Sequence, residues 1–199
     1  MVEPVVSIEL PITIGLAIIF LGERLTGLQG VLMVAIFAGV LSVVTTHRFQ
    51  LHYHRRMMER GVIYAGLAGI SLALTNVIVG FSSRLSSPLL TIWAIDAVLT
   101  ALCLVYLLVD GEFRTLAHDW RKRPTEILLA GVIDNAAWVF YAISTVYISV
   151  SVSNAINESY VALAALLGVI VNRERLKRHQ KWGIVVALAG VIVLASISE

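Results

Sequence analysis

Charge and cysteine are scarce in this chain of 199 residues, and each shortage narrows what the protein can be. Only 14% of the residues are charged and 58% are hydrophobic, whereas roughly a quarter of a typical soluble domain is charged. The single cysteine, Cys103, excludes an intrachain disulfide and suggests no metal cluster. The composition indicates a chain that lies largely in lipid.

Catalytic and cofactor motifs are also missing. No P-loop, HExxH or GxSxG pattern occurs, and all 5 histidines fall in or beside loops. The last apolar run has no internal lysine that could carry a Schiff base. We therefore expect no enzyme activity, no catalytic residue, no metal and no cofactor. No basic segment or cleavage site accompanies the first apolar run, so we expect a retained helix there and not a signal peptide.

The chain does contain seven long apolar runs, each of roughly 16 to 22 residues, which is about the length needed to cross about 30 Å of hydrocarbon. They are continuous and do not alternate, which excludes barrel strands. The runs are Pro4 to Leu21, Leu28 to Val44, Val62 to Ser82, Leu89 to Val109, Glu126 to Tyr147, Ser153 to Val171 and Trp182 to Ile197. The predicted fold is all-α, a polytopic transmembrane bundle of about seven helices in the cell membrane. Pro11 is expected to kink the first helix.

Basic residues gather on one side of the predicted membrane. Of the 15 Lys and Arg residues, only Arg24 and Arg84 fall on the opposite face. The positive-inside rule then places the N-terminus inside and the C-terminus outside. Short basic loops between membrane spans fit anionic headgroups better than nucleic acid, so the lipid bilayer is an expected partner and nucleic acid is not.

Two stretches of the chain repeat each other. Glu9 to Val44 can be laid on Ser153 to Leu194, with one constant offset from the elbow between the two helices onward. The alignment pairs Glu23 with Glu174, Gln29 with Gln180, and Gly39 with Gly190. Because the matched runs lie five helices apart, they cross the membrane in opposite directions and form an inverted repeat, as in many transporters. We expect the elbow glutamates to shape the turns and not to bind solute.

The two elbows carry the sequence motifs GERL and RERL. Each motif is followed by a glutamine and then by the tripeptide Ala-Gly-Val. The stretch GVIYAGLAGISLALTNVIVG follows from Gly61, and Ser87-Pro88 precedes the next helix. In this order they resemble the EamA-type transporters of the drug/metabolite transporter superfamily, which are built as an inverted 5+5 repeat. The resemblance implies that residues 1–45 are the last two helices of the first repeat, that 46–61 are a basic loop, and that 62–199 are the second repeat. The resemblance further implies that the first three helices of the family are lacking here, and that the C-terminus lies inside, opposite to the side that the charge bias indicates.

The resemblance implies a secondary transporter, either a permease or an exporter, of a small metabolite or drug-like solute. Alternating access between the inverted repeats would move the solute. Another copy, or a separate chain, would supply the missing helices. Two other classes stay open at this point: a structural or regulatory membrane subunit or inactive truncated fragment, and a membrane enzyme or receptor, against which the missing motifs argue.

Polar side chains inside the apolar runs are the candidate solute-binding residues. A charged side chain near the bilayer centre costs at least about 2.5 kcal/mol, so it should face protein or water. Asn154 and Glu158 are four residues apart and share one helical face, with Asn157 beside them. Glu9 lies at a depth similar to that of Glu158 in the other repeat. This cluster is the first hypothesis for the site.

A second group lies on the fifth run, where Asp134, Trp138 and Tyr141 follow at steps of four and three on one face. Asp96 ranks lower because its run usually lies outside the central cavity of the family. The predicted substrate-binding residues are Glu158, Asn154, Asn157, Asp134, Trp138, Tyr141, Asn76 and Glu9. The simpler alternative is that the asparagines bridge helices and the aromatic rings pack.

Overall fold

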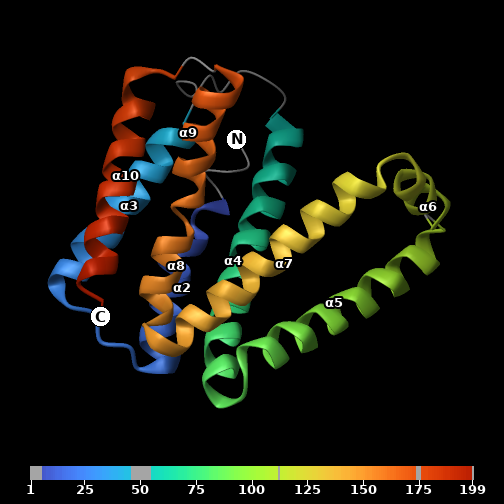
Figure 1. Cartoon of the computed structure of the whole chain (residues 1–199), viewed down its shortest axis with the longest axis horizontal. Coiled ribbons are helices and arrows are strands. Elements are labelled where there is room, and N and C mark those ends of the chain that lie inside the picture. The colour runs from blue at the N-terminus through green and yellow to red at the C-terminus, as the bar shows by residue number, and fades with distance from the viewer. Residues whose placement is uncertain (1–5, 46–54, 112, 174–175, 199) are drawn as a thin grey trace. The chain divides into compact units, whose positions relative to one another are not determined.

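The computed structural model describes residues 6–45, 55–111, 113–173 and 176–198, and its regular structure there is helical (Figure 1). The helices are α2 (Glu9–Leu21), α3 (Gly27–Val44), α4 (Arg55–Leu85), α5 (Pro88–Asp110), α6 (Phe113–Lys122), α7 (Pro124–Tyr147), α8 (Val150–Asn157), α9 (Tyr160–Asn172) and α10 (Arg178–Ser196). Within these residues, six segments are long and apolar enough to cross a membrane: Gly27–Val44, Gly61–Leu85, Pro88–Asp110, Pro124–Tyr147, Val150–Asn172 and Arg178–Ser196. The predicted polytopic helical bundle is confirmed.

The first predicted run differs from the helix that forms there. With 13 residues, α2 is a shorter apolar helix than the six candidate spans. Pro4, where the run was predicted to begin, lies outside the described residues. Pro11 is the third residue of α2, where a backbone N–H has no partner within the helix in any case. Pro11 thus lies in the first turn of α2, where proline is tolerated, and the kink expected there stays a prediction.

The sixth predicted run is one span divided into α8 and α9. At the division, the Ser159 N–H donates to the Ile156 carbonyl at 3.1 Å and the Ala162 N–H donates to the Ser159 carbonyl at 2.9 Å. These are the tighter bonds of a 3₁₀ turn. The Ser159 hydroxyl also donates to the Ile156 carbonyl at 2.6 Å, which competes with regular helical bonding. A continuous apolar pattern gives no sign of this division.

One helix was not predicted, namely α6, which follows α5 and precedes α7. Phe113, Leu116 and Trp120 recur at steps of three and four along it and are exposed. Arg121 and Lys122 occupy its last turn. An amphipathic helix with basic residues suits the membrane surface and not a membrane span. At 10 residues, α6 has no long apolar run that a search for spans would find.

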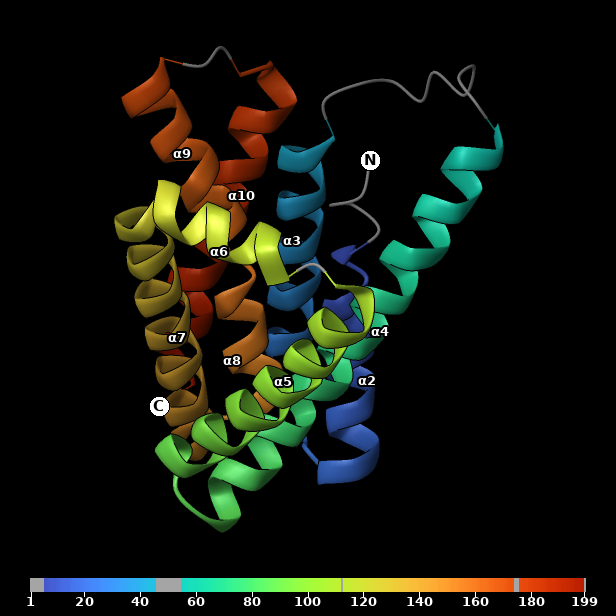
Figure 2. The ribbon, with the colours of Figure 1, turned by 90° about the vertical axis from the view of Figure 1, so that its right-hand side faces the viewer.

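The chain divides into two compact units, each described here by itself. The first consists of Met1–Ile78 with Ile148–Glu199, and the second is Val79–Tyr147, so that α4 contributes to both. In the first unit α3 packs along α10 and α2 packs against α8, and Figure 2 shows these helices from the side. In the second unit α5 and α6 both contact α7.

Glycines bring α3 and α10 into backbone contact. A Cβ atom added at Gly39 would lie 2.8 Å from the carbonyl oxygen of Gly183, and one added at Gly183 would lie 2.7 Å from the carbonyl oxygen of Gly39. Near the other end, a Cβ atom added at Gly190 would lie 2.9 Å from Cγ1 of Ile36. As residue numbers rise along α3 their partners fall along α10, so the two helices run antiparallel.

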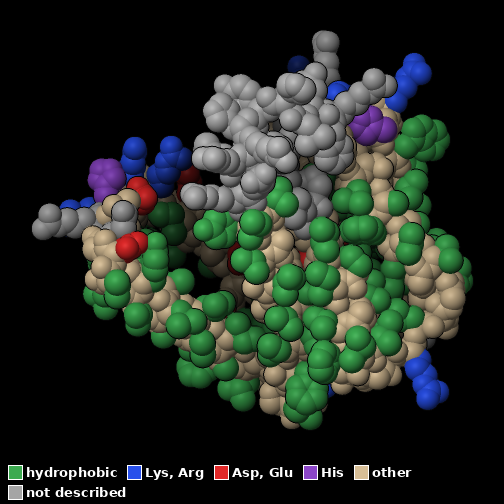
Figure 3. Space-filling model, turned by 180° about the vertical axis from the view of Figure 1, so that it is seen from behind, with side chains coloured by type: hydrophobic (Ala, Val, Ile, Leu, Met, Phe, Trp, Pro, Cys, Tyr) green, Lys and Arg blue, Asp and Glu red, His purple; other side chains and the backbone are tan. Residues whose placement is uncertain are grey.

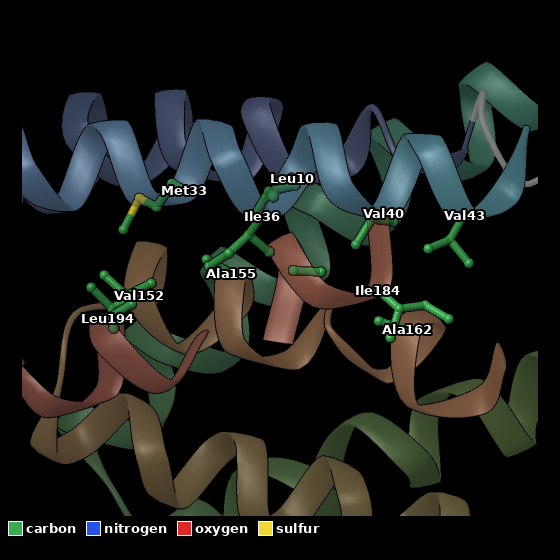
Figure 4. Close-up of a cluster of buried hydrophobic side chains, with 11 residues drawn as sticks. Leu10, Met33, Ile36, Val40, Val43, Val152, Ala155, Ala162, Ile184 and Leu194 are labelled. Carbon is green, nitrogen blue, oxygen red and sulfur yellow. The ribbon is translucent and has the colours of Figure 1, made fainter. Parts of the chain in front are cut away.

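The core of the first unit gathers apolar side chains from α2, α3, α8, α9 and α10 (Figure 4). Its buried members are Leu10, Met33, Ile36, Val40, Val43, Val152, Ala155, Ala162, Ile184, Ala187 and Leu194. Many other large apolar side chains are exposed, among them Ile19 at 74% and Val109 at 83%, and Figure 3 shows hydrophobic side chains across one face. Such exposure suits contact with lipid, where close packing holds helices together.

The elbows that precede α3 and α10 share one local arrangement. The Thr26 N–H donates to Oε1 of Gln29 at 3.0 Å, and the Lys177 N–H donates to Oε1 of Gln180 at 2.9 Å. Gln180 also donates through Nε2 to the Val43 carbonyl at 2.9 Å, which ties the start of α10 to the end of α3. Thr26 and Lys177 fall at the offset that aligns Gln29 with Gln180. The repeat in the sequence is thus also a repeat of helix-capping geometry.

Candidate functional site

Three buried polar side chains from three helices of the first unit form one hydrogen-bond network. Nδ2 of Asn76, on α4, donates to Oε1 of Glu9, on α2, at 2.5 Å. It also donates to Oδ1 of Asn154, on α8, at 3.0 Å. Glu9 is 7% exposed, Asn76 is 2% exposed and Asn154 is fully buried. Asn76 therefore joins a carboxylate and an amide that are far apart in the sequence.

The local sequence explains why α4 can bring a short asparagine into this network. Ala65, Gly69 and Ala73 precede Asn76 at steps of four, four and three, and all are buried. These residues form one helical face of small side chains. Small residues let neighbouring helices approach closely in a membrane. The amide of Asn76 can thus reach two other helices without a long side chain.

Two buried polar atoms of the first unit have no hydrogen-bond partner among the described residues. They are Nδ2 of Asn154 and the hydroxyl oxygen of Thr13. Both residues are fully buried. Thr13 lies four residues after Glu9 on α2, so the two share one helical face. Buried polar groups nearly always form hydrogen bonds. These two atoms are therefore available to form a hydrogen bond with another molecule beside the network.

Glu158 and Asn157 lie differently although they are neighbours in the sequence. Glu158 is 7% exposed. Its backbone N–H donates to the Asn154 carbonyl at 2.9 Å, which places its side chain one turn beyond Asn154. Asn157 is exposed. The structure thus brings Glu158, but not Asn157, to the buried face of α8 that carries Asn154.

The candidates on α7 belong to the second unit. Trp138 and Tyr141 meet edge to face, with ring centroids 5.9 Å apart. Tyr141 is buried in an apolar cluster with Val79 and Ile92, and Trp138 packs against that cluster. Asp134 is exposed. The shared face predicted from their spacing therefore contains both a packed aromatic pair and an exposed carboxylate.

Sequence reasoning missed one polar contact of the second unit. Nδ2 of Asn135, on α7, donates to Oδ2 of Asp96, on α5. The sequence pattern ranks Asp96 below the other candidates and does not single out Asn135. The hydropathy of the sequence identifies Asp96 and Asn135 as polar residues within apolar runs. Their hydrogen bond, however, depends on how α5 packs against α7. This contact links the two helices.

The elbow residue Glu23 has a partner that the sequence did not indicate. Oε1 of Glu23 accepts from the Val150 N–H at 2.6 Å. Oε2 accepts from the Ser151 N–H at 3.1 Å and from the Ser151 hydroxyl at 2.7 Å. The carboxylate thus caps the N-terminus of α8, where backbone N–H groups lack partners and negative charge is favourable. Glu174, its match in the repeat, lies outside the described residues.

No group of three or more His, Cys, Asp or Glu side chains that could hold a metal ion occurs within the described part of the chain. What the first unit offers instead is hydrogen bonding by amides, a hydroxyl and carboxylates. Such groups can bind a small polar molecule and release it without a covalent step.

Comparison with known proteins gives one match. The model of the EamA-like transporter family matches residues 59–196, which include α5 to α10 and most of α4. Neither the curated proteins nor the solved structures gave a match.

Proposed function

The chain belongs to the EamA-like transporter family, and from that premise we propose that it carries a small polar solute across the cell membrane by alternating access. It is a multi-pass integral membrane protein, and the described part of the chain contains six segments that are long and apolar enough to cross the bilayer. The proposal adds to family membership a secondary transport mechanism, as a permease or exporter. It also adds a small metabolite or drug-like molecule as solute, and a place where that solute is bound.

The network of Glu9, Asn76 and Asn154 carries the proposal. A structural bridge between two membrane helices needs only one hydrogen-bonded pair. Here Asn76 bonds to two helices at once, and Nδ2 of Asn154 still has no partner among the described residues. Polar and ionisable groups inside a membrane protein commonly mark a solute pathway. The network therefore suits transient binding of a polar molecule.

The packing of α3 on α10 supports alternating access. A Cβ atom at Gly39 would meet Ala187, and one at Gly190 would meet Ile36. The sequence repeat aligns Gly39 with Gly190 and Ile36 with Ala187, so each contact is the counterpart of the other. Reciprocal contacts of this kind are expected about a twofold axis. Rocking of inverted repeats about such an axis would expose a site to one side and then to the other.

Release of solutes from proteoliposomes tests the proposal. The purified protein is reconstituted into vesicles loaded with a small-metabolite extract, and mass spectrometry identifies the compounds that leave. We expect the wild-type protein to release particular compounds and Asn76→Leu, which removes both hydrogen bonds, to lose that release. Ser71→Leu, at an exposed position of the same helix, is the matched control and should behave as the wild type.

Two results would count against the proposal. Equal release by Asn76→Leu and wild type would place the network outside the solute path. Release of no compound by the wild-type protein would favour a structural or regulatory subunit.

A further inference from the structure

We propose that α6 is a binding site for anionic phospholipid, whose headgroups the basic side chains of Arg121 and Lys122 bind while the apolar face of the helix enters the boundary of the bilayer. This inference goes beyond the transport function proposed above and does not depend on it. It rests on the second unit alone: on the position of α6, on the division of its surface into two faces, and on its connection to α7.

The chain order places α6 at the surface of a bilayer. It follows α5, which ends at Asp110, and precedes α7, which begins at Pro124, and both of these helices are long and apolar enough to cross a membrane. Figure 1 shows α6 between the end of α5 and the start of α7. With 10 residues, α6 is itself too short to cross. Lipid headgroups therefore surround α6 beside its own unit.

The surface of α6 divides into an apolar and a polar face. Phe113, Leu116 and Trp120 recur at steps of three and four, and each is 46% or 47% exposed. His118 and Lys122, which are four residues apart and exposed, lie on the opposite face. A helix of this pattern lies in the plane of the interface, with its apolar side chains about 5–10 Å into the headgroup boundary.

The charge of α6 favours anionic lipid. Arg121 and Lys122 are exposed, and among the described residues neither forms an ion pair with a carboxylate. Arg123, which follows α6, does form one, since its Nη1 lies 3.1 Å from Oε2 of Glu126. Asp119 is the one acidic residue of α6. Two cations thus remain to attract headgroups, and a zwitterionic headgroup answers them less well because its own cation offsets its phosphate.

The connection from α6 to α7 is a hydrogen-bonded corner. Only Arg123 separates the two helices. Its N–H donates to the Asp119 carbonyl at 3.0 Å, and its carbonyl accepts from the Ile127 N–H at 3.2 Å. Pro124 disfavours a helical backbone at the residue before it, which ends α6 at this point. Lipid bound by α6 is therefore connected directly to the start of a membrane span.

Quenching of Trp120 by brominated lipids tests the proposal. Trp93→Phe, Trp138→Phe and Trp182→Phe leave Trp120 as the single tryptophan of the chain. The full chain is reconstituted at low ionic strength into phosphatidylcholine vesicles that contain either brominated phosphatidylglycerol or brominated phosphatidylcholine. We expect phosphatidylglycerol to bind beside Trp120 roughly tenfold more tightly, and we expect high salt to reduce this preference.

Charge substitutions in α6 then connect the preference to its basic side chains. Arg121→Gln combined with Lys122→Gln should reduce the preference to near unity. Arg121→Lys combined with Lys122→Arg keeps both charges and should retain it. Arg24→Gln removes a charge from an exposed elbow of the first unit, which the charge pattern predicts on the other side of the membrane, and should leave the preference unaltered. Thermal unfolding of each purified variant identifies any loss that comes from misfolding.

A second label decides the matter if the three Phe substitutions prevent folding. Cys103→Ser combined with Ala117→Cys places a fluorophore at an exposed position on the apolar face of α6 and keeps all four tryptophans. Nitroxide lipids with the same two headgroups then act as the quenchers.

Three results would overturn the proposal. Equal quenching by the two lipids at low ionic strength would show that α6 does not select anionic lipid. A preference that persists when Arg121 and Lys122 are both Gln would place the lipid site elsewhere. Quenching by neither lipid would show that the apolar face of α6 does not meet the bilayer. Release of solutes is measured separately, so each of these results leaves the transport function untouched.

Discussion

Gly39 and Gly183 hold the backbones of α3 and α10 against each other, since a Cβ atom on either would lie within 2.8 Å of the other residue's carbonyl oxygen. The two helices belong to matched copies in the sequence and run antiparallel. Close contact of this kind requires that neither residue has a side chain. The stability of the first unit should therefore depend on both glycines.

Gly39→Ala is expected to destabilise the protein by about 1–3 kcal/mol, because the added methyl group must displace backbone atoms and not a flexible side chain. Gly30→Ala is the control in the same helix, since a Cβ atom there would meet nothing within 4 Å. That change should be neutral or stabilise by up to about 1 kcal/mol. Thermal unfolding in detergent compares the two, and equal midpoints would contradict the close contact.

The carboxylate of Glu23 should protect the start of α8. Glu23→Ala removes the acceptors for the Val150 and Ser151 N–H groups, at an expected cost of about 1 kcal/mol. Hydrogen exchange at these two amides should become faster. Arg24→Ala changes the exposed neighbour in the same elbow and should leave both rates unchanged. Unaltered exchange in Glu23→Ala would show that the cap does not contribute.

Arg173 offers a substitution that should stabilise the protein. Its φ is 54°, a left-handed conformation at the end of α9, whereas the matching position at the end of α2 is Gly22, with φ 65°. A side chain in this conformation costs roughly 1 kcal/mol, so Arg173→Gly should raise the unfolding midpoint. Lys181→Gly, within α10, should lower it by a similar amount. A lower midpoint for Arg173→Gly would contradict the assigned conformation.

The helices could be predicted from the sequence because each apolar run carries its own signal. The apolar run Val62 to Ser82 predicts a helix, and α4 extends further, from Arg55 to Leu85, because more polar turns continue it at both ends, mainly at the N-terminal end. The division at Ser159 could not be predicted, since it depends on one hydroxyl that bonds to a backbone carbonyl inside a run that otherwise reads as continuous. The amphipathic helix α6 could not be predicted from a continuous apolar run, because its apolar residues are spaced along one face.

The site could be predicted only in part. Spacing along one helix places Asn154 and Glu158 together, and the structure has them on one buried face. The bond from Asn76 to Glu9 joins residues separated by 67 positions, and no pattern within either helix indicates that pairing. The role of Glu23 was missed for the same reason, because its partners on α8 lie 127 and 128 positions away.

Reactivity of a cysteine at position 154 tests most directly whether the buried network lies on a solute path. Cys103→Ser removes the single native thiol, which is exposed. Asn154→Cys and Ala155→Cys then place a thiol at neighbouring positions that are both fully buried in this structure. Each variant is reconstituted and treated with a water-soluble methanethiosulfonate reagent that does not cross lipid. The account predicts modification at position 154 at least about tenfold faster than at position 155, because alternating access opens the polar face to water and leaves the apolar core closed. Equal resistance at both positions would contradict it and make the network a structural link between helices.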